Sequence, residues 1–304
     1  MIKLLIGGSP CTFWSVSGGQ LDTHEMKAEG LGWELFRNYL IAKEKFKPDF
    51  FLYENNKSAA QEIKSQISRE LGADLMYINS ALVSAQERER FYCFNWEVEQ
   101  PTDRRIYLDS ILYDHEYKPR DFSKYKNTIR WDSAGEVISW DTSGKGWYSQ
   151  QNRARIPSAA KINAVPSSGD DKNNIYLGNY KCRKIHPIEA ERLQTLPDNY
   201  TATIKRKSKR VEMCGNGWTA EIIIHILNGV LKDVPRDEEI VVLSMYDGIG
   251  TGRYCLDKMG FTNVKYFAYE IDRDAMAVSL SNYPDIVQKG DAFGVRHPDW
   301  TIGY

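Results

Sequence analysis

The end of the chain alternates between short apolar runs and helix-like segments, and this alternation restricts the fold more than any other feature. Strands are predicted over Ile240–Met245 and Val264–Tyr269, and helices over Arg253–Met259 and Arg273–Asn282. Apolar runs without strict alternation indicate strands that are buried on both faces, as in a parallel sheet covered by helices. The order strand, helix, strand, helix is typical of α/β proteins.

The first hundred residues repeat this order. Ile2–Ile6 and Phe50–Tyr53 predict strands, and the apolar spacing over Leu31–Phe46 predicts a helix between them. A further helix, a strand and its hairpin partner are predicted at Ala59–Leu71, Leu75–Val83 and Arg90–Asn95. We therefore expect one Rossmann-like α/β sheet assembled from both ends of the chain.

The middle of the chain, between about residues 96 and 181, loses this alternation. Short polar segments with turn signals replace it, and we interpret them as a smaller, irregular, β-rich domain inserted into the sheet. Its aromatic residues Trp131, Trp140, Trp147 and Tyr148 are interpreted as local core rather than as a stacking surface for bases. Helices over Pro187–Leu196 and Trp218–Leu231 are predicted to follow.

Composition excludes several classes of protein. The 304 residues suffice for about two domains, and 40 Lys plus Arg against 41 Asp plus Glu argue against a general polyanion-binding surface. No apolar run approaches the roughly 18 residues of a membrane span, and no leader is recognisable, so a cytoplasmic location is expected, in a bacterium or a phage-infected host. Five cysteines and five histidines show no ligand spacing, which predicts neither disulfides nor a metal site.

A glycine turn indicates a cofactor site. The segment from Tyr246 to Gly252 (YDGIGTG) joins a predicted strand to a helix, and Glu270 ends the next strand 22 residues after Gly248. Glycines let a ligand approach the backbone, and an acid at the second strand end accepts ribose hydroxyls. Neither GxGxxG nor GK[ST] is present, which favours a ribose without a pyrophosphate, as in S-adenosylmethionine. Asp291 supplies a third strand-end acid for the adenine amino group.

A cysteine follows the first strand directly. Ile2–Ile6 runs into Gly7-Gly8-Ser9-Pro10-Cys11, and in open α/β sheets ligands bind at the carboxyl ends of the strands. Pro10 restricts the backbone just before the thiol. Cys11 is therefore predicted to be a nucleophile.

Several blocks together resemble the cytosine-5 DNA methyltransferase family, over nearly the whole chain except its middle. They are Pro10-Cys11, Glu54-Asn55-Asn56, the QERER segment 86–90, Arg183 to Asp198, and Gly215-Asn216 opening a late helix. Most members begin with the glycine turn and reach Pro-Cys later, whereas here the order is rotated. The chain therefore resembles a circular permutant, a rearrangement tolerated where chain ends lie close at the surface.

The resemblance implies a mechanism. The Cys11 thiolate adds to C6 of cytosine, which activates C5 for methylation, and Glu54 contacts N3 and the amino group. Arg90 reaches the base and Arg88 supports the site, and either charge is a candidate to favour the thiolate. The cofactor S-adenosylmethionine leaves as S-adenosylhomocysteine. Its predicted contacts are Tyr246, Asp247, Gly248, Ile249, Gly250, Thr251, Gly252, Glu270, Ile271, Asp291 and Asn216.

The substrate implied is double-stranded DNA with the target cytosine flipped out. Its predicted contacts are Ser9, Pro10, Gln86, Arg183, Lys205, Arg206, Lys207, Lys209 and Arg210. The segment from Trp14 to Gly30, with Gly18-Gly19 and Gly30 as hinges, is expected to cover the base as a lid. Thr251, Trp218 and Asn56 depart from the family pattern without removing a catalytic atom.

The resulting expectation is a monomeric DNA cytosine-5 methyltransferase of a restriction-modification system, phage or prophage. Residues 1–97 and 212–304 are expected to form the catalytic domain, and residues 98–211 the target-recognition domain. Two alternatives stay open: an RNA (tRNA) cytosine-5 methyltransferase, and a catalytically silent DNA-binding relative. The presence of Cys11, Glu54, Arg88 and Arg90 together argues against a silent protein.

Overall fold

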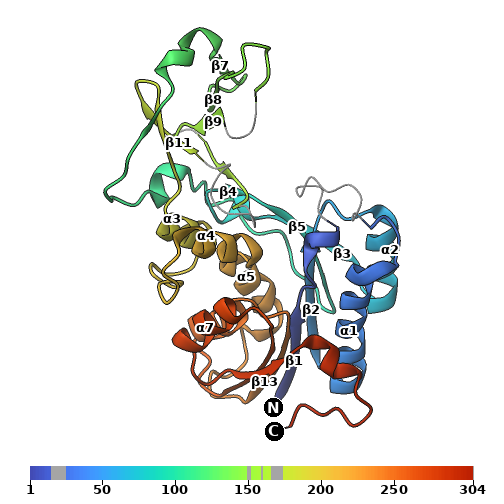
Figure 1. Cartoon of the computed structure of the whole chain (residues 1–304). Helices are drawn as coiled ribbons and strands as arrows, with labels where there is room; N and C mark the ends of the chain where they lie inside the picture. Colours follow the sequence, from blue (N-terminus) through green and yellow to red (C-terminus); the bar gives the residue numbers. More distant parts are fainter. Residues whose placement is uncertain (15–24, 149–151, 159, 166–173, 304) are drawn as a thin grey trace. The chain divides into compact units, whose positions relative to one another are not determined.

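The computed structural model describes residues 1–14, 25–148, 152–158, 160–165 and 174–303, which form two compact units (Figure 1). The first unit comprises Met1–Ile78, Glu89–Gln100 and Ile222–Tyr304, and the second comprises Asn79–Arg88 and Pro101–Glu221. The predicted domain limits differ from these units at three places. Residues 79–88 and 212–221, predicted for the catalytic domain, pack with the second unit, and residues 98–100, predicted for the target-recognition domain, pack with the first.

Within the described residues, the first unit is built on a sheet of seven strands in the order β15-β14-β13-β1-β2-β5-β3. The strands are β1 (Ile2–Gly7), β2 (Phe50–Asn56), β3 (Leu75–Asn79), β5 (Glu89–Phe94), β13 (Ile240–Met245), β14 (Val264–Tyr269) and β15 (Val287–Gly290). Parallel pairing joins β15, β14, β13, β1 and β2, and β5 runs antiparallel to β2. The predicted Rossmann-like α/β fold, assembled from both ends of the chain, is confirmed.

At the centre of this sheet, the chain connections on the two sides run outward in opposite directions. Strands β1 and β13 lie side by side, with Gly7 opposite Met245. From β1 the chain continues to β2 on one side, and from β13 it continues to β14 on the other. In open α/β sheets such a switch point opens a crevice at the carboxyl ends of the two strands, where ligands bind.

Helices cover both faces of the sheet, with α1 (Gly30–Phe46) and α2 (Gln61–Leu71) on one face and α5 (Ala220–Leu231) and α7 (Arg273–Asn282) on the other (Figure 1). Every residue of β13 is buried, as a strand between two helical layers requires. Phe36 and Tyr39 of α1 pack edge to face on Tyr53, with ring centroids 5.1 Å apart in both pairs. Burying each such ring stabilises the fold by roughly 1.5–3 kcal/mol.

The second unit contains a sheet of short strands, six in the described residues, in the order β6-β12-β11-β9-β8-β7. These strands are β6 (Arg120–Asp121), β7 (Arg130–Trp131), β8 (Val137–Ser139), β9 (Arg153–Arg155), β11 (Asn174–Gly178) and β12 (Lys181–Lys184). Helices α3 (Pro187–Leu193) and α4 (Lys207–Asn216) follow. The second unit therefore has the β-rich, irregular character predicted for the middle of the chain.

The aromatic residues of this unit divide into two groups. Trp140 is fully buried and stacks on Phe122 with ring centroids 3.9 Å apart, as the local-core prediction requires. The prediction is wrong for Trp131 and Trp147, which are 53% and 76% exposed. Trp131 lies in β7, a two-residue strand at the sheet edge, and Trp147 lies in a loop, so neither has a second layer to cover it.

Two further expectations are wrong at the level of single elements. Gly215-Asn216 does not open a helix but ends α4, and α5 begins at Ala220. The last four residues of the basic run, 207–210, form the first turn of α4, which the sequence analysis did not predict. Gln86 does not begin a hairpin with the next strand. It lies in β4 (Gln86–Glu87), which pairs with β10 (Ile162–Asn163).

Candidate active site

The carboxyl end of β1 is held tightly between its two neighbouring strands. A Cβ atom on Gly7 would lie 2.4 Å from the carbonyl oxygen of Met245, and one on Gly8 would lie 2.5 Å from that of Glu54. Any side chain at either position would force the strands apart. The two glycines therefore bring the segment that carries Cys11 against both the end of β13 and the end of β2.

Cys11 begins a short 3₁₀ helix, Cys11–Phe13, directly after this clamp. The backbone before it is fixed from β2, because the Asn55 amide donates to the Ser9 carbonyl at 2.8 Å and the hydroxyls of Ser9 and Tyr53 are 2.7 Å apart. Ser9 is buried, so it supports this loop and is no longer a candidate DNA contact, whereas Pro10 is exposed.

Cys11 differs from the other four cysteines, all of which lie in the described part of the chain. Its side chain is partly exposed, whereas Cys93, Cys182, Cys214 and Cys255 are buried. Burial raises the pKa of Cys93 to about 12 and that of Cys182 to about 11, so these thiols stay protonated at neutral pH. Cys11 is the thiol with access to a ligand.

Glu54 and Arg90 lie on neighbouring antiparallel strands and form an ion pair. Arg90 stands opposite Asn56 in the register of β2 and β5, so its side chain shares a face with Asn56 and with Glu54 two residues earlier. Arg90 Nε lies 3.2 Å from Glu54 Oε1, and both side chains are about seven-eighths buried, with 13% and 12% exposed. The pair occupies the same edge of the sheet as Cys11.

Arg88 belongs to the second unit. Its guanidinium donates to the carbonyl oxygens of Gly215 at 3.0 Å and Gly217 at 2.9 Å, at the end of α4. Arg88 is buried there. Its observed role is therefore to hold the Gly215–Gly217 turn, and its support of the catalytic site stays a prediction.

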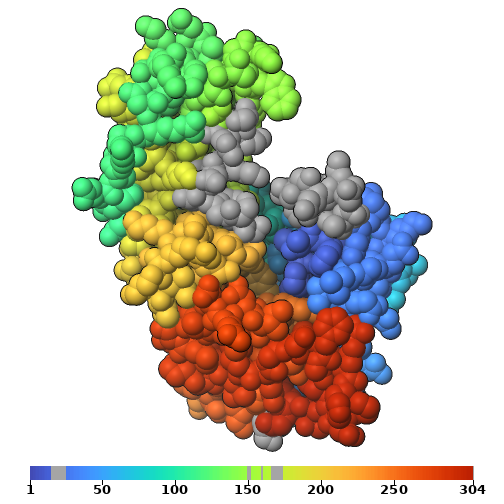
Figure 2. Space-filling model, viewed as in Figure 1, coloured from blue at the N-terminus to red at the C-terminus, as the bar shows by residue number. Residues whose placement is uncertain are grey.

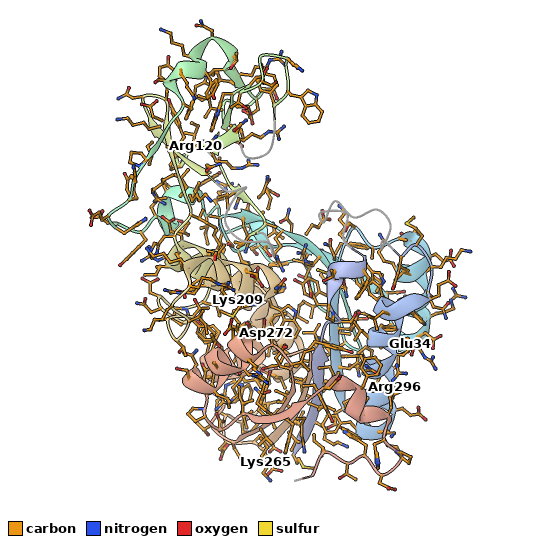
Figure 3. The ribbon with its side chains drawn as sticks, viewed as in Figure 1. Glu34, Arg120, Lys209, Lys265, Asp272 and Arg296 are labelled. Carbon is orange, nitrogen blue, oxygen red and sulfur yellow. The ribbon has the colours of Figure 1, made fainter. Side chains whose placement is uncertain are left out.

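Residues of α1 hold the glycine turn that follows β13. Tyr246 adopts a positive φ of 62°, a strained conformation for a non-glycine residue, and its hydroxyl donates to the Leu35 carbonyl at 2.7 Å. Asn38 donates to the same hydroxyl and accepts from Arg296, which is paired with Glu34 at 2.7 Å (Figure 3). This network fixes the start of the turn.

Asp247 points its carboxyl group inward, beneath the turn. One oxygen accepts from the hydroxyls of Tyr266 at 2.6 Å and Ser244 at 2.7 Å, while the other is buried and finds no hydrogen-bond partner among the described residues. Burial raises the pKa of Asp247 to about 6. Asp247 thus supports the turn with its side chain and can offer a ligand its backbone.

The remaining residues of the turn leave space above it. Gly248 has φ of 64°, and within the described structure no atom lies within 4 Å of where its Cβ would be. Ile249 and Thr251 are buried, so they also present backbone to the crevice. Gly252 must lack a side chain, since a Cβ there would lie 2.5 Å from the Tyr266 hydroxyl.

The strand ends beside the turn carry groups that suit an adenosine. Glu270 accepts the Gly248 amide at 2.8 Å through Oε2 and the amides of Ile271 and Asp272 through Oε1, which leaves a lone pair on Oε2 for a ribose hydroxyl. Ile271 is 70% exposed. Its apolar side chain is available to cover a flat ring, so the residues present fit S-adenosylmethionine.

Phe293, which sequence analysis did not single out, lies beside the predicted cofactor contact Asp291. It is 37% exposed and follows Asp291, which caps the 3₁₀ helix Ala292–Arg296 by accepting the Phe293 amide at 2.9 Å. An exposed phenylalanine two residues after a strand-end acid is a detectable signal. It was overlooked because the strand β15 before it is short.

Most of the predicted DNA contacts lie in the second unit, and two are engaged in its interior. Gln86 is fully buried and donates to the Leu193 carbonyl at 2.6 Å, and Arg183 forms a bidentate ion pair with buried Glu189 at 2.6 and 2.8 Å. Both residues stabilise this unit, and we withdraw them as DNA contacts. Asn216, expected to contact the cofactor, is exposed at the end of α4.

The basic run divides into free and paired charges. Lys205, Arg206 and Lys207 are exposed around the start of α4. Lys209 pairs with Glu212 at 2.9 Å, and Arg210 pairs with buried Glu191 at 2.8 Å (Lys209 is labelled in Figure 3). The exposed three therefore remain candidates for phosphate contacts.

Most of the predicted lid, residues 14–30, lies outside the described residues. Its hinge glycines Gly18 and Gly19 belong to residues 15–24, which the structure does not describe. Its two ends meet, since the Glu25 amide donates to the Phe13 carbonyl at 2.9 Å. Glu25 also accepts from the Trp14 indole at 2.9 Å and from the Gly32 amide at 2.8 Å. Both ends are thus tied to the start of α1.

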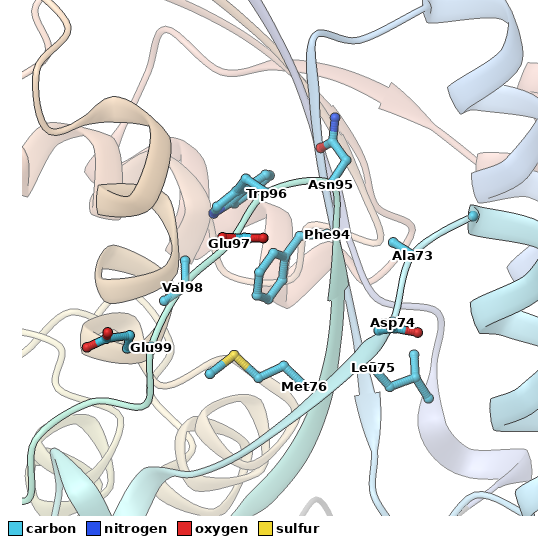
Figure 4. A pocket seen from close by; sticks show the side chains of 11 residues that line it. Ala73, Asp74, Leu75, Met76, Phe94, Asn95, Trp96, Glu97, Val98 and Glu99 are labelled. Atoms are coloured by element: carbon cyan, nitrogen blue, oxygen red, sulfur yellow. The ribbon is translucent and has the colours of Figure 1, made fainter.

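A cavity of about 800 Å³ lies elsewhere in the first unit (Figure 4). It is lined by residues 72–76 and 94–99, at the start of β3 and beyond the end of β5. Because β5 is antiparallel to β2, this is the end of the sheet opposite to Glu54, so the cavity is not the candidate active site. No described group of three or more His, Cys, Asp or Glu side chains forms a metal site, and no described helix is long and apolar enough to span a membrane.

The family model of the C-5 cytosine-specific DNA methylases matches residues 1–130 and 96–232 of this sequence. The chain belongs to the C-5 cytosine-specific DNA methylase family. It is therefore a methyltransferase of a family that acts on cytosine C5 and uses S-adenosylmethionine. The match includes Cys11, Glu54, Arg88 and Arg90.

A crystal structure of a DNMT2 mutant from Spodoptera frugiperda is 13% identical, covers 74% of this chain and 78% of that one, and has a TM-score of 0.44. A crystal structure titled as a DNA modification methyltransferase from an E. coli prophage is 18% identical, with 76% and 79% covered and a TM-score of 0.40. No curated protein matches this DNA methylase family member significantly.

Proposed function

We propose that this protein transfers a methyl group from S-adenosylmethionine to C5 of a cytosine in double-stranded DNA, through a covalent bond between Cys11 and C6. One observation carries the proposal. Strands β13, β1 and β2 end side by side, and they bear the glycine turn, Cys11 and the Glu54–Arg90 pair. A methyl donor, a nucleophile and an acid for the base are thus available at one edge of one sheet.

The cofactor would bind over Gly248, with its ribose on Glu270 and its adenine beside Ile271 and Phe293. Bound there, S-adenosylmethionine supplies an electrophilic methyl group. The buried support from Asp247 and Tyr266 keeps the turn in place while the ligand binds, so little reorganisation is needed. Asp291 keeps one carboxylate oxygen free of the Phe293 amide to accept from the adenine amino group.

The chain's own residues would then carry the addition. The Cys11 thiolate forms a bond to C6, and the electron pair moves towards C5, which takes the methyl group. Glu54 contacts N3 and the amino group and stabilises the ring during the addition, and Arg90 holds the Glu54 side chain in position. Loss of the C5 proton to a base then breaks the bond from Cys11 to C6 and frees the thiol.

The choice of DNA rests on the family model, and the exposed cations Lys205, Arg206 and Lys207 suit a phosphate backbone. The proposal includes the rotated order of the motifs. The strand that bears the glycine turn comes late in the sequence and yet lies at the centre of the sheet beside β1. A chain whose sequence begins with β13 and a chain whose sequence begins with β1 can therefore form the same sheet.

The proposal is tested with unmethylated duplex DNA in which cytosine is replaced by 5-fluorocytosine. Because fluorine cannot leave as the C5 proton does, the protein should remain bound to this DNA in denaturing gels when S-adenosylmethionine is present. Cys11→Ala should form no adduct, whereas the thiol control Cys93→Ala, altered on the buried face packed against α1 and α2, should form it.

Ordinary duplex DNA and tRNA are compared as methyl acceptors in parallel, and bisulfite sequencing locates the methylated cytosines. Transfer to tRNA alone would contradict the DNA proposal, and C5 methylation by Cys11→Ala would contradict the covalent step. Binding of DNA without any methyl transfer would favour the silent alternative.

A further inference from the structure

One loop of the second unit presents an aromatic ring to solvent. Trp147 is 76% exposed, the highest value for a large apolar side chain among the described residues. It lies in the loop Asp141–Tyr148 that follows β8, beyond the buried Trp140 (β7, β8 and β9 are labelled in Figure 1). Exposing so large a ring is unfavourable in water, so a binding role is worth testing.

The loop has a defined conformation. Asp141 is buried and acts as its anchor: one carboxylate oxygen accepts from the Ser143 amide and hydroxyl at 2.8 and 2.7 Å, and the other accepts from the Gly146 amide at 2.6 Å. Gly144 and Gly146 have φ of 69° and 78°, which glycine adopts without strain. These contacts also lower the pKa of Asp141, so the anchor stays charged at neutral pH.

The loop is tied to the neighbouring segment 123–131. The Thr128 hydroxyl donates to the Asp141 carbonyl at 3.0 Å and accepts its amide at 3.1 Å. The Arg130 guanidinium lies over the Tyr148 ring, 4.3 Å from its centroid. Trp147 is therefore presented from a fixed base, which reduces the entropy lost when it binds a ligand.

The loop 141–148 and the neighbouring segment 123–131 carry an excess of cations. Lys124, Lys126 and Arg130 on the neighbouring segment and Lys145 in the loop are all exposed, against one carboxylate, that of buried Asp141. The surface of this part of the unit appears in green at residues 120–148 in Figure 2.

We propose that Trp147 stacks on a base of the bound DNA while Arg130, Lys124, Lys126 and Lys145 contact the phosphates around it. The inference rests on the proposed function, from which it takes DNA as the ligand. An exposed indole on a unit with separate exposed cations matches the chemistry of a nucleic acid, whose backbone is anionic and whose bases offer flat faces where base flipping breaks the stack. A protein partner would favour a contiguous apolar patch instead.

The test measures the Kd of the wild-type protein and its variants for a fluorescent, unmethylated duplex. Trp147→Ala should raise Kd roughly 5- to 150-fold, and Trp147→Phe should stay within about threefold of wild type because a phenyl ring still stacks. Trp131→Ala is the matched control, since Trp131 is also exposed but lies edge-on against Tyr176, 6.2 Å away, and should leave Kd within about twofold. Circular dichroism verifies that each variant is folded.

Salt dependence separates the ring from the charges. Arg130→Gln should lower the slope of log K against log salt by about one, whereas Trp147→Ala should leave the slope unchanged. Equal Kd values for Trp147→Ala and wild type would overturn the inference, as would an equal loss in Trp147→Phe. These measurements need no cofactor, so failure of wild type to methylate DNA would count against the proposed function and not against the binding role of Trp147.

Discussion

Arg90 and Glu54 face each other across two antiparallel strands, with Arg90 Nε 3.2 Å from Glu54 Oε1. Sequence analysis had assigned Arg90 to the base itself. Its pairing with Glu54 makes the two side chains one unit, in which the arginine orients the carboxyl group that we propose contacts the base. Low exposure strengthens this coupling, because water screens the pair less.

This coupling predicts non-additive kinetics. Glu54→Gln should lower the single-turnover rate of methyl transfer about 10²- to 10⁴-fold, the usual contribution of a positioned acid. Arg90→Gln should lower the rate less, and the double variant should be little slower than Glu54→Gln, because Arg90 acts through Glu54. Rates are measured with saturating DNA and cofactor. Multiplicative losses would show that Arg90 acts separately on the base.

The burial of four thiols predicts selective alkylation. Iodoacetamide should modify the native protein once, at Cys11, since the buried thiols are shielded and the pKa values of Cys93 and Cys182 are raised by burial. Intact-mass spectrometry of Cys11→Ala should show no adduct, and the unfolded wild-type chain should take five. A second native adduct that forms as fast as the first would contradict this reading.

Asp247 predicts a pH-dependent stability. Because the pKa of Asp247 is raised to about 6 in the folded protein, the protonated side chain contributes to the free energy of unfolding. This contribution is complete below the ordinary pKa of an aspartate and is lost as pH rises through 6. The loss amounts to at most about 3 kcal/mol. Asp247→Asn, which removes the buried charge, should therefore be more stable than wild type at pH 8, and the difference should shrink towards pH 4. Urea unfolding across this range measures it. A constant difference would exclude titration of Asp247.

We expect Glu270 to contribute to the affinity for the cofactor. Glu270→Ala removes the acceptor for the Gly248, Ile271 and Asp272 amides as well as for the ribose, so S-adenosylhomocysteine should bind roughly 10- to 1,000-fold more weakly by calorimetry. Glu239→Gln serves as the control, because Glu239 lies before β13 at the other end of the sheet and pairs with Lys265 at 3.0 Å. It should bind as wild type does. Equal affinity of Glu270→Ala and wild type would remove Glu270 from the site.

The basic run predicts unequal salt effects. Replacement of Lys205, Arg206 or Lys207 by Gln should each reduce the salt slope of DNA binding by about one. Lys209→Gln should change the slope less, because Lys209 is already paired with Glu212. Binding titrations at several salt concentrations measure the slopes. Slopes equal to that of wild type in all four variants would show that the basic run does not contact the DNA backbone.

The sequence by itself determined the sheet and the order of its elements. The strands over Ile240–Met245 and Val264–Tyr269 and the helix over Arg273–Asn282 have the predicted bounds, because continuous apolar runs and helical periodicity are local signals. The blocks around Cys11, Glu54 and Gly248 were equally readable, since each follows a strand directly.

Only the tertiary structure decided what each side chain contacts. Gln86 and Arg183 carry polar groups suited to DNA, yet both bind buried partners within the protein. Gln86 donates to the carbonyl of Leu193, which is distant in sequence, and Arg183 pairs with Glu189, which no sequence pattern marks as its partner. Tyr266 and Ser244 donate to the Asp247 carboxylate, but they lie within apolar strands, so the sequence does not show that their hydroxyls have this role. Local periodicity specifies elements, whereas burial and pairing depend on which elements meet, and that follows from long-range packing.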